Sequence, residues 1–374
     1  MRVLGFAFFA SAGGDFHPLV AVAAGLRARG HHVQLFCDPE GARLVVETGI
    51  GTVVDEEGWA AFARVDDELR PRAQQGAPGE RARLVAEWLT RRMNTLLPAA
   101  VRAVKQARPD LIVSATLAAS LARDAAGDTS TAWCIVNSTY DLARAPETPV
   151  TEWLAQALRA APLVLHATDA VFDDDAEAGP GREYVGPLFW EPSAPVPSYL
   201  LEEGPPWALV SVSLAPQGDI ALVPAALKAI SALGLRGVAT IGEKNDPPAV
   251  GALPPGAHVE NSLSHAAVLE RAALLVSHAG HGSVSKALWY GVPMVLVPWG
   301  RDQPGVALRA ERLGVACVVS PNDLDALPDA IADVMTDDRY RTNAASHASR
   351  IRSGDPLTLA CDRIEAYIAT ASPW

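Results

Sequence analysis

The densest group of chemically active residues follows a predicted strand at Leu274 to Val276. A histidine, two glycines and a serine stand where a helix over about 282–290 would begin: His278, Gly280, Gly282 and Ser283. A helix N-terminus has unpaired N–H groups, and its dipole favours negative charge. Glycine also lets an anion approach the backbone closely. This segment therefore predicts a phosphate-binding turn.

A second apolar run, Met294 to Val297, predicts the next strand and is followed by Asp302 and Gln303. A carboxylate accepts hydrogen bonds, and an amide both donates and accepts them, so the pair suits a polyhydroxylated ring. Phosphate at one strand end and hydroxyl groups at the next indicate a nucleotide-sugar site.

Residues 274–303 resemble the donor-binding segment of inverting GT-B glycosyltransferases of the UDP-glucuronosyl/glucosyltransferase type, in particular those of bacterial natural-product and antibiotic biosynthesis. The family signature continues through Gly291-Val292-Pro293 to the acidic residue and glutamine. An ordinary strand–helix–strand unit with turn glycines would leave His278, Asp302 and Gln303 unexplained. The resemblance implies an α/β fold with two Rossmann-like, doubly wound parallel-sheet domains facing across a cleft.

Three further polar residues are weaker donor-site candidates. Ser211 and Ser213 end a predicted strand at Trp207 to Ser213, where they would reach the phosphate or simply form a polar strand end. His265 starts another predicted helix and is either a donor contact or a helix cap. Many relatives have Trp and Pro-Gln near this position; this chain lacks the Trp, so thymidine and uridine both remain open.

The catalytic base is expected directly after the first predicted strand, because ligands bind at the carboxyl ends of strands in α/β sheets. Relatives have Gly, then His or Asp, and a Pro; Gly14 and Pro18 match this pattern and Asp15 falls at the base position. Asp15 would otherwise cap the helix beginning near Pro18. His17 is the alternative base.

The resemblance also implies an acid after the strand Leu111 to Ser114, where a histidine base commonly finds its partner. Ala115, Thr116 and Leu117 stand there instead. This absence favours Asp15 over His17, because a carboxylate needs no partner to fix its tautomer. The pKa of aspartate is about 3.9 and that of a phenol about 10. Either proton removal is concerted with attack, or desolvation raises the pKa of Asp15. The mismatch in pKa also favours an acidic acceptor, such as a phenol or an activated aromatic carbon.

The acceptor site is expected in the first domain, where aromatic and polar side chains line the predicted pocket. The candidates are Phe16, Trp59, Phe62, Trp88, Met93, Tyr140 and Asn137 with the adjacent Ser138. Aromatic residues at helical spacing also suit a hydrophobic core, and Asn137 with Ser138 also suits a polar turn. Both alternatives stay open at this point.

Composition bounds the class of protein. The 374 residues predict about two domains, and the net charge of −12 without a basic run argues against a nucleic-acid partner. Four distant cysteines lack metal-site spacing and indicate reduced thiols in a cytoplasmic protein. The apolar run Val3 to Ala10 is too short for a membrane span and lacks a signal-peptide pattern.

Alternating strand and helix patterns divide the chain into an N-terminal acceptor domain at 1–190 and a C-terminal nucleotide-sugar domain at 207–354. Residues 191–206 are expected to be a linker, and the resemblance implies that 355–374 form a helix returning to the first domain. The polar stretch Asp55 to Gly79 is expected to be a loop over a pocket. Pro98 is expected to kink or split the long helix around it.

The predicted activity is metal-independent, inverting hexosyl transfer from a TDP- or UDP-sugar to a hydrophobic, aromatic natural product, without a cofactor. A catalytically silent nucleotide-sugar-binding partner is the alternative. A dinucleotide oxidoreductase is third, because Gly280-His281-Gly282 lacks the third glycine of the dinucleotide fingerprint. Homodimer formation stays open, and stable membrane insertion is not expected.

Overall fold

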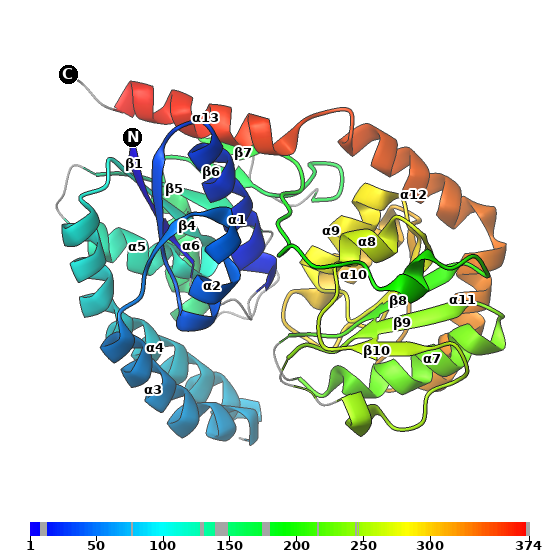
Figure 1. The fold of residues 1–374 in the computed structure, drawn as a ribbon. Helices are drawn as coiled ribbons and strands as arrows, with labels where there is room; N and C mark the ends of the chain where they lie inside the picture. The colour runs from blue at the N-terminus through cyan, green and yellow to red at the C-terminus, as the bar shows by residue number, and fades with distance from the viewer. Residues whose placement is uncertain are drawn as a thin grey trace. The chain divides into compact units, whose positions relative to one another are not determined.

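The computed structural model describes residues 1–7, 13–75, 78–127, 131–138, 149–173, 180–214, 217–243, 245 and 247–371. By their contacts the residues form two compact units (Figure 1). Unit 1 comprises Met1–Ala167, Glu177–Trp190 and Pro356–Trp374, and unit 2 comprises Thr168–Ala176 and Glu191–Asp355. Each unit contains one parallel sheet with helices on both faces, which confirms the expected α/β fold class.

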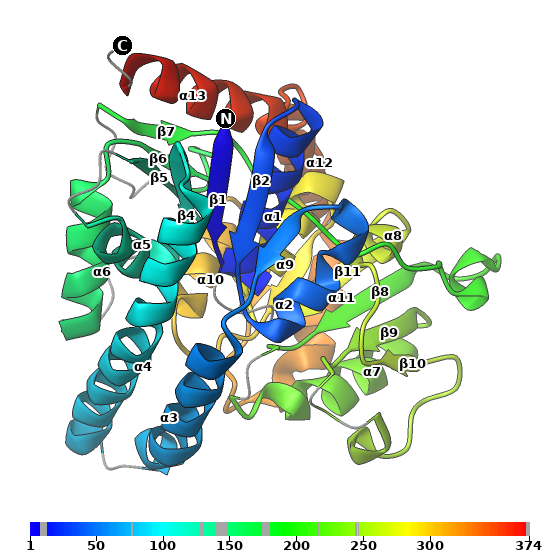
Figure 2. The ribbon, with the colours of Figure 1, turned by 60° about the vertical axis from the view of Figure 1, so that its left-hand side comes forward.

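The sheet of unit 1 has the strand order β3-β2-β1-β4-β5-β6-β7, of which the part from β2 to β7 can be followed in Figure 2. The strands are β1 (Arg2–Phe6), β2 (His32–Phe36), β3 (Gly51–Val53), β4 (Leu111–Ala115), β5 (Ala132–Asn137), β6 (Val164–His166) and β7 (Arg182–Tyr184). All neighbouring strands pair in parallel. The order reverses between β1 and β4, which makes their carboxyl ends the switch point where ligands bind in such sheets.

Alternation along the strands builds a core on each face of this sheet. Val3 packs into one core and Leu4 and Phe6 into the other, because successive side chains of a strand point to opposite faces. The first core is covered by α1 (Gly13–Ala28) and α13 (Pro356–Ala371). The second is covered by α3 (Glu56–Gln75), α4 (Pro78–Ala107) and α5 (Ala119–Ala126), and α6 (Pro149–Ala160) packs beside α5. A short helix, α2 (Pro39–Leu44), follows β2.

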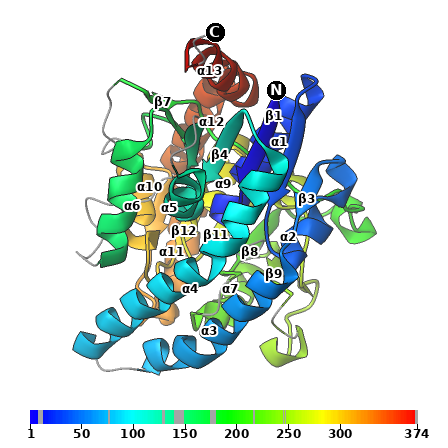
Figure 3. The same ribbon diagram turned by 90° about the vertical axis from the view of Figure 1, so that its left-hand side faces the viewer.

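The expected loop at 55–79 is wrong, because α3 occupies most of it. Trp59, Phe62, Val65 and Leu69 recur every three or four residues and are buried, so they form one apolar stripe. Asp55 accepts a hydrogen bond from the N–H of Gly58 at 2.8 Å at the start of the helix. The many charged residues between these positions hid the stripe. Figure 3 shows α3 beside α4, which continues unbroken through Pro98.

The sheet of unit 2 has the order β10-β9-β8-β11-β12-β13, again wholly parallel. Its strands are β8 (Trp207–Ser211), β9 (Arg236–Thr240), β10 (His258–Glu260), β11 (Ala272–Ser277), β12 (Met294–Leu296) and β13 (Ala316–Val318). One face is covered by α7 (Leu222–Ala232) and α11 (Leu327–Thr336). The other is covered by α8 (His265–Leu269), α9 (His281–Tyr290), α10 (Gln303–Arg312) and α12 (Asp338–Ile351).

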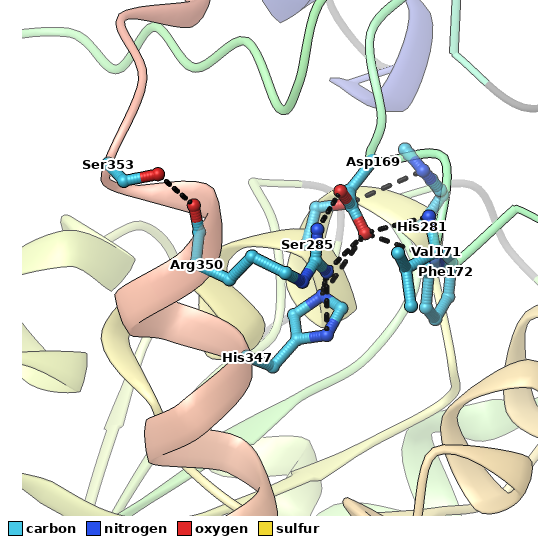
Figure 4. A network of polar contacts seen from close by, with 8 residues as sticks. All are labelled: Asp169, Val171, Phe172, His281, Ser285, His347, Arg350 and Ser353. Carbon is cyan, nitrogen blue, oxygen red and sulfur yellow. Dashed lines mark hydrogen bonds and ion pairs between the residues drawn. The ribbon is translucent and has the colours of Figure 1, made fainter.

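The segment Thr168–Ala176, between β6 and β7, is a short excursion of the chain that belongs to unit 2, although the N-terminal domain was expected to run through residue 190. Asp169 accepts hydrogen bonds from both terminal nitrogens of Arg350 at 2.5 and 2.6 Å, a bidentate pair on α12 (Figure 4). Phe172 is buried in the core of unit 2 beside His281, and Asp173 pairs with Arg309 at 3.2 Å. These contacts fasten the excursion to unit 2.

The expected linker also packs on unit 2. Glu191 accepts a hydrogen bond from the hydroxyl of Ser264 at 2.7 Å and pairs with the ammonium of Lys286, and Leu200 is buried in the core. Burial raises the pKa of Glu191, but Lys286, His265 and the hydrogen bond from Ser264 together outweigh this effect and lower the pKa to about 2. The first residue of the linker is therefore held in place by a buried ion pair.

Two further properties concern the whole described chain. None of its helices combines the length and apolarity that a membrane span needs. All four cysteines are free thiols; Cys37, Cys134 and Cys361 are buried and Cys317 is half-buried. Burial raises the pKa of Cys37 and of Cys134 to about 12, so these two thiols stay protonated and unreactive at neutral pH.

Candidate functional site

The predicted phosphate-binding turn lies at the switch point of unit 2. The strand order reverses between β8 and β11, and Ser211 and Ser277 are register partners at the ends of these two strands. His278 comes directly after β11. The carboxyl ends of the two strands thus open the crevice in which doubly wound sheets bind ligands.

The imidazole of His278 is clamped between β8 and the turn. Its Nδ1 lies 3.1 Å from the carbonyl oxygen of Ser211, and its main-chain N–H donates to the same oxygen at 3.2 Å. A Cβ atom at Gly280 would lie only 2.4 Å from Nε2 of His278, so the ring occupies the space that any other residue at 280 would need. Burial lowers the pKa of His278, which favours the neutral ring.

The backbone between His278 and α9 has an uncommon conformation. Ala279 is fully buried and has a φ of 64°, in the left-handed region that few residues other than glycine adopt. Gly280 is the N-cap of α9, and the N–H groups of the first turn have no partner within the helix. Strain of this kind is found at ligand-binding sites. The turn therefore directs main-chain N–H groups outward from a fixed backbone.

Two hydroxyl groups complete the edge of this turn. The Oγ atoms of Ser211 on β8 and Ser283 on α9 lie 3.2 Å apart. Hydroxyl groups can donate to an anion, as the N–H groups of α9 can. The structure thus brings together Ser211, His278, Gly280 and Ser283 in an arrangement that can bind a phosphate group.

Gln303, the expected sugar ligand, contacts the loops after β8 and β12 in the structure. It is only 2% exposed, and its Oε1 accepts hydrogen bonds from the N–H groups of Trp299 at 2.8 Å and Gly300 at 3.1 Å. Its Nε2 donates to Oε1 of Gln217 at 3.0 Å. Oε1 and one N–H of the amide are thus occupied, and Gln303 braces the loop after β12. Its role as a sugar ligand stays a prediction.

The neighbouring donor-site candidates lie on the same side of the sheet. Asp302 is half-buried at the N-cap of α10, and burial raises its pKa. Asp219 accepts from the main-chain N–H of Ser213 at 2.7 Å and from Gln217 at 2.9 Å, all within the loop after β8. Ser213 is thereby held through its backbone. Gln217 in turn accepts from Gln303 at 3.0 Å, which links this loop to the one after β12.

His265 is a contact of β9 and not the cap of its helix. Its Nε2 lies 2.8 Å from Oγ1 of Thr240, at the end of β9. The capping oxygen belongs to Ser264, which accepts from the N–H of Ala267 at 3.1 Å. Burial, together with the nearby charge of Lys286, lowers the pKa of His265 to about 4, so the ring is neutral at pH 7.

In unit 1, the expected base Asp15 lies at the other switch point, between β1 and β4. Asp15 is half-buried in the first turn of α1, and its Oδ1 accepts a hydrogen bond from the N–H of Thr116 at 2.9 Å. Thr116 follows β4 directly. The expected alternative, His17, packs edge-on against Trp190 with ring centroids 5.7 Å apart.

A chain of buried hydrogen bonds continues from Thr116 along the sheet edge. Oγ1 of Thr116 donates to Oδ1 of Asn137 at 2.8 Å, and Nδ2 of Asn137 lies 3.1 Å from Nδ1 of His166. Because an amide nitrogen only donates, Nδ1 accepts and Nε2 carries the proton. Burial lowers the pKa of His166 to about 4, and its ring stacks on Tyr184 at 4.9 Å.

Sequence reasoning missed Thr116 and His166 as members of this network. The available signal was positional, since apolar runs at 111–114, 132–136 and 163–166 predict strands, and Thr116, Asn137 and His166 lie at or just after their carboxyl ends. Thr116 also stands where the resemblance implied an acid. It brings a main-chain N–H and a hydroxyl to Asp15 and Asn137 in place of a carboxylate.

Four of the eight expected acceptor contacts are buried in the cores of unit 1. Phe16, Trp59 and Met93 are 1%, 6% and 7% exposed and belong to the two hydrophobic cores of unit 1, as does Phe62. The spacing of Trp59 and Phe62 along α3 places both side chains in the core. Trp88 is half-buried, and its Nε1 donates to Asp66 on α3 at 2.9 Å. Tyr140 lies outside the described residues.

Comparison with known proteins agrees with this geometry. Residues 225–358 match the family model of the erythromycin biosynthesis protein CIII-like, C-terminal domain. The chain is 26% identical to O-mycaminosyltylonolide 6-deoxyallosyltransferase of Streptomyces fradiae, over 96% of each protein.

Solved structures share the fold over the whole chain. The calicheamicin glycosyltransferase CalG4 matches with a TM-score of 0.77 at 21% identity, covering 100% of both chains. The spinosyn rhamnosyltransferase SpnG, whose structures include complexes with thymidine diphosphate and with the spinosyn aglycone, matches with a TM-score of 0.75, covering 96% of this chain and 99% of its own. The resemblance inferred from residues 274–303 is confirmed, and this chain is a GT-B-fold homologue of the glycosyltransferases of antibiotic biosynthesis.

Proposed function

We propose that this protein transfers a sugar, with inversion, from a TDP-sugar or a UDP-sugar to a hydroxyl group of a hydrophobic, aromatic acceptor. The observation that carries the proposal is the clamp of His278 on Ser211, over Gly280, at the switch point of unit 2. Gly280, Gly282 and Ser283 at the start of α9 are partly exposed, which supports this turn as the diphosphate site. The solved complex of SpnG with thymidine diphosphate supports thymidine as the first nucleoside to test.

In the proposed reaction the acceptor oxygen attacks the anomeric carbon while the bond from that carbon to the diphosphate oxygen breaks. Asp15 takes the proton of the attacking hydroxyl. The diphosphate leaves with the bonding electrons, and the N–H groups of α9, the hydroxyls of Ser211 and Ser283, and His278 stabilise its growing charge. Stabilisation of this kind needs donors that are already oriented, which the clamp on Ser211 provides.

Thr116 and Asn137 are positioning residues in this proposal. The N–H of Thr116 holds one oxygen of Asp15, and the hydroxyl of Thr116 is itself held by Asn137. A base must lie within hydrogen-bond reach of the proton that it removes, so its orientation affects the rate directly. The buried chain at the sheet edge supplies that orientation in place of an acidic partner.

Binding and transfer measurements test the proposal separately. Titration calorimetry with TDP and UDP measures donor-site affinity. Incubation with TDP- and UDP-glucose and a panel of phenolic acceptors, followed by mass spectrometry, detects the glycoside, and proton NMR of the anomeric signal gives the stereochemistry. Inverted product supports the proposal. Donor binding without transfer to any acceptor would instead support a catalytically silent nucleotide-sugar-binding partner.

A further inference from the structure

The tautomer of His278 is fixed by its clamp. Nδ1 lies 3.1 Å from the carbonyl oxygen of Ser211 and 3.5 Å from the hydroxyl oxygen of Ser277. A carbonyl oxygen only accepts hydrogen bonds, so the shorter contact places the proton on Nδ1, and the hydroxyl of Ser277, which can also accept, is compatible with it. In a neutral imidazole the other nitrogen then carries a lone pair and no proton. Nε2 of free His278 is therefore a hydrogen-bond acceptor.

This lone pair lies beside the expected phosphate position. A Cβ atom at Gly280 would lie 2.4 Å from Nε2, which places this nitrogen against the N-cap of α9. Phosphate oxygens at neutral pH only accept hydrogen bonds. A diphosphate at the N-terminus of α9 and the lone pair of Nε2 would therefore repel each other unless a proton lies between them.

Burial, more than the surrounding charges, favours the neutral ring of His278 in the free protein. Burial lowers the pKa of His278, and Arg301 lowers it further, whereas the Ser211 carbonyl and the carboxylate of Asp219 raise it. The neighbouring ring of His265 is neutral. A bound diphosphate adds two negative charges next to Nε2, and nearby negative charge favours the protonated form.

We infer that the sugar nucleotide binds together with one proton, which Nε2 of His278 takes from solvent and donates as a hydrogen bond to the diphosphate. This inference rests on the proposed function and deepens it. In the transfer step the bond between the anomeric carbon and the phosphate oxygen breaks, and its electron pair goes to that oxygen. The imidazolium then faces the increased negative charge, and the proton leaves the ring when the diphosphate departs.

Linkage fixes the direction of the pH dependence. A group whose pKa is higher in the complex than in the free protein strengthens binding at low pH. The Kd of the sugar nucleotide should therefore be constant below the pKa of free His278. Above that value it should rise, by at most about tenfold per pH unit, until the pKa in the complex is reached.

Calorimetry measures directly how many protons the protein takes up when the sugar nucleotide binds. TDP-glucose is titrated at pH 7.5 in PIPES, HEPES and Tris, whose ionisation enthalpies differ, and the slope of the observed enthalpy against these values gives the protons taken up. TDP-glucose is preferred to TDP because neither of its phosphates titrates near neutral pH. We expect uptake of more than about half a proton per nucleotide bound.

Two variants locate the proton. His278→Asn retains a side-chain N–H donor for Ser211 but cannot titrate, so uptake and pH dependence should both disappear. His258→Asn is the matched control; His258 stacks on Tyr199 at 3.7 Å elsewhere in unit 2 and should leave uptake unchanged. Should His278→Asn fail to fold, the Kd of the unmodified protein between pH 6 and 9 decides the matter.

The outcomes separate the inference from the function. Binding of TDP-glucose without proton uptake, or undiminished uptake by His278→Asn, would overturn the inference and leave the proposed function intact. Failure of both TDP-glucose and UDP-glucose to bind would contradict the proposed function and the inference together.

Discussion

The main-chain N–H of Thr116 donates a hydrogen bond of 2.9 Å to the carboxylate of Asp15, 101 positions away in the sequence. The two residues follow β4 and β1, the neighbouring strands at which the sheet order of unit 1 reverses. The place implied for an acidic partner is therefore occupied by a backbone donor, whose own side chain is anchored on Asn137.

Replacing Thr116 by valine keeps its shape but removes the hydroxyl that anchors it. We expect kcat for glycosyl transfer to fall about tenfold, the equivalent of ~1.4 kcal/mol in the barrier, with the KM for the sugar nucleotide unchanged. Thr116→Ser retains the hydroxyl and should restore most of the rate. Steady-state kinetics of both variants would refute a positioning role if valine and serine behaved alike.

Replacing Gly280 by alanine places a methyl group 2.4 Å from Nε2 of His278. The ring or the backbone must move, and overpacking of this kind costs about 1–3 kcal/mol. We expect the Kd for TDP to rise at least about tenfold. Gly354→Ala, at a position with open space within 4 Å, is the control and should bind TDP normally. Equal affinities for TDP in calorimetry would contradict the clamp.

Replacing Gln303 by leucine removes the acceptor of two main-chain N–H groups in the loop after β12. Unsatisfied buried donors cost about 1–3 kcal/mol, so the free energy of unfolding should fall by that order. The KM for the sugar nucleotide should rise, because the loop that carries Asp302 loses its brace. Gln156→Leu on the exposed side of α6 should change neither quantity. Urea denaturation and kinetics measure the two effects.

The pair of Glu191 and Lys286 should make stability depend on pH. The pKa of Glu191 is about 2 in the folded protein against 4.5 for the ordinary side chain, so its contribution is complete above pH 4.5 and is lost as the pH falls toward 2. Glu191→Gln should therefore destabilise the protein at pH 7, and this deficit should shrink by on the order of 3 kcal/mol between pH 5 and pH 2.

Urea denaturation of Glu191→Gln and of the unmodified protein at several pH values measures the deficit. Glu57→Gln, an exposed position at the start of α3, is the control and should show no such trend. A deficit that stayed constant with pH would show that Glu191 is not ionised in a buried pair.

Most of the strand order was predictable from the sequence because buried parallel strands form short apolar runs separated by helical patterns. The edge strand β7 was missed because its residues Arg182–Tyr184 are polar and only half-buried. The donor turn was predictable because His278, Gly280 and Ser283 are close in sequence. α3 was missed because its stripe of Trp59, Phe62 and Leu69 is diluted by charged residues.

The contacts that cross the chain could not be predicted, because only folding brings their partners together. The network from Asp15 to His166 joins four segments, each of which contributes one ordinary polar residue. The docking of Asp169 on Arg350 and the burial of Gln303 likewise depend on tertiary packing. For the same reason, the helical spacing of large apolar residues did not distinguish a pocket lining from a core at Trp59 and Met93.

The central claim is that Asp15 removes the proton of the acceptor while the turn at His278 binds the diphosphate independently of it. The most direct test compares Asp15→Asn with Asp67→Asn, an exposed carboxylate on α3 of the same unit, in transfer rate and in TDP affinity. We expect Asp15→Asn to lose about a hundred- to ten-thousandfold in kcat, the usual contribution of a general base, with the Kd for TDP unchanged. Transfer by Asp15→Asn at the rate of Asp67→Asn would contradict the account.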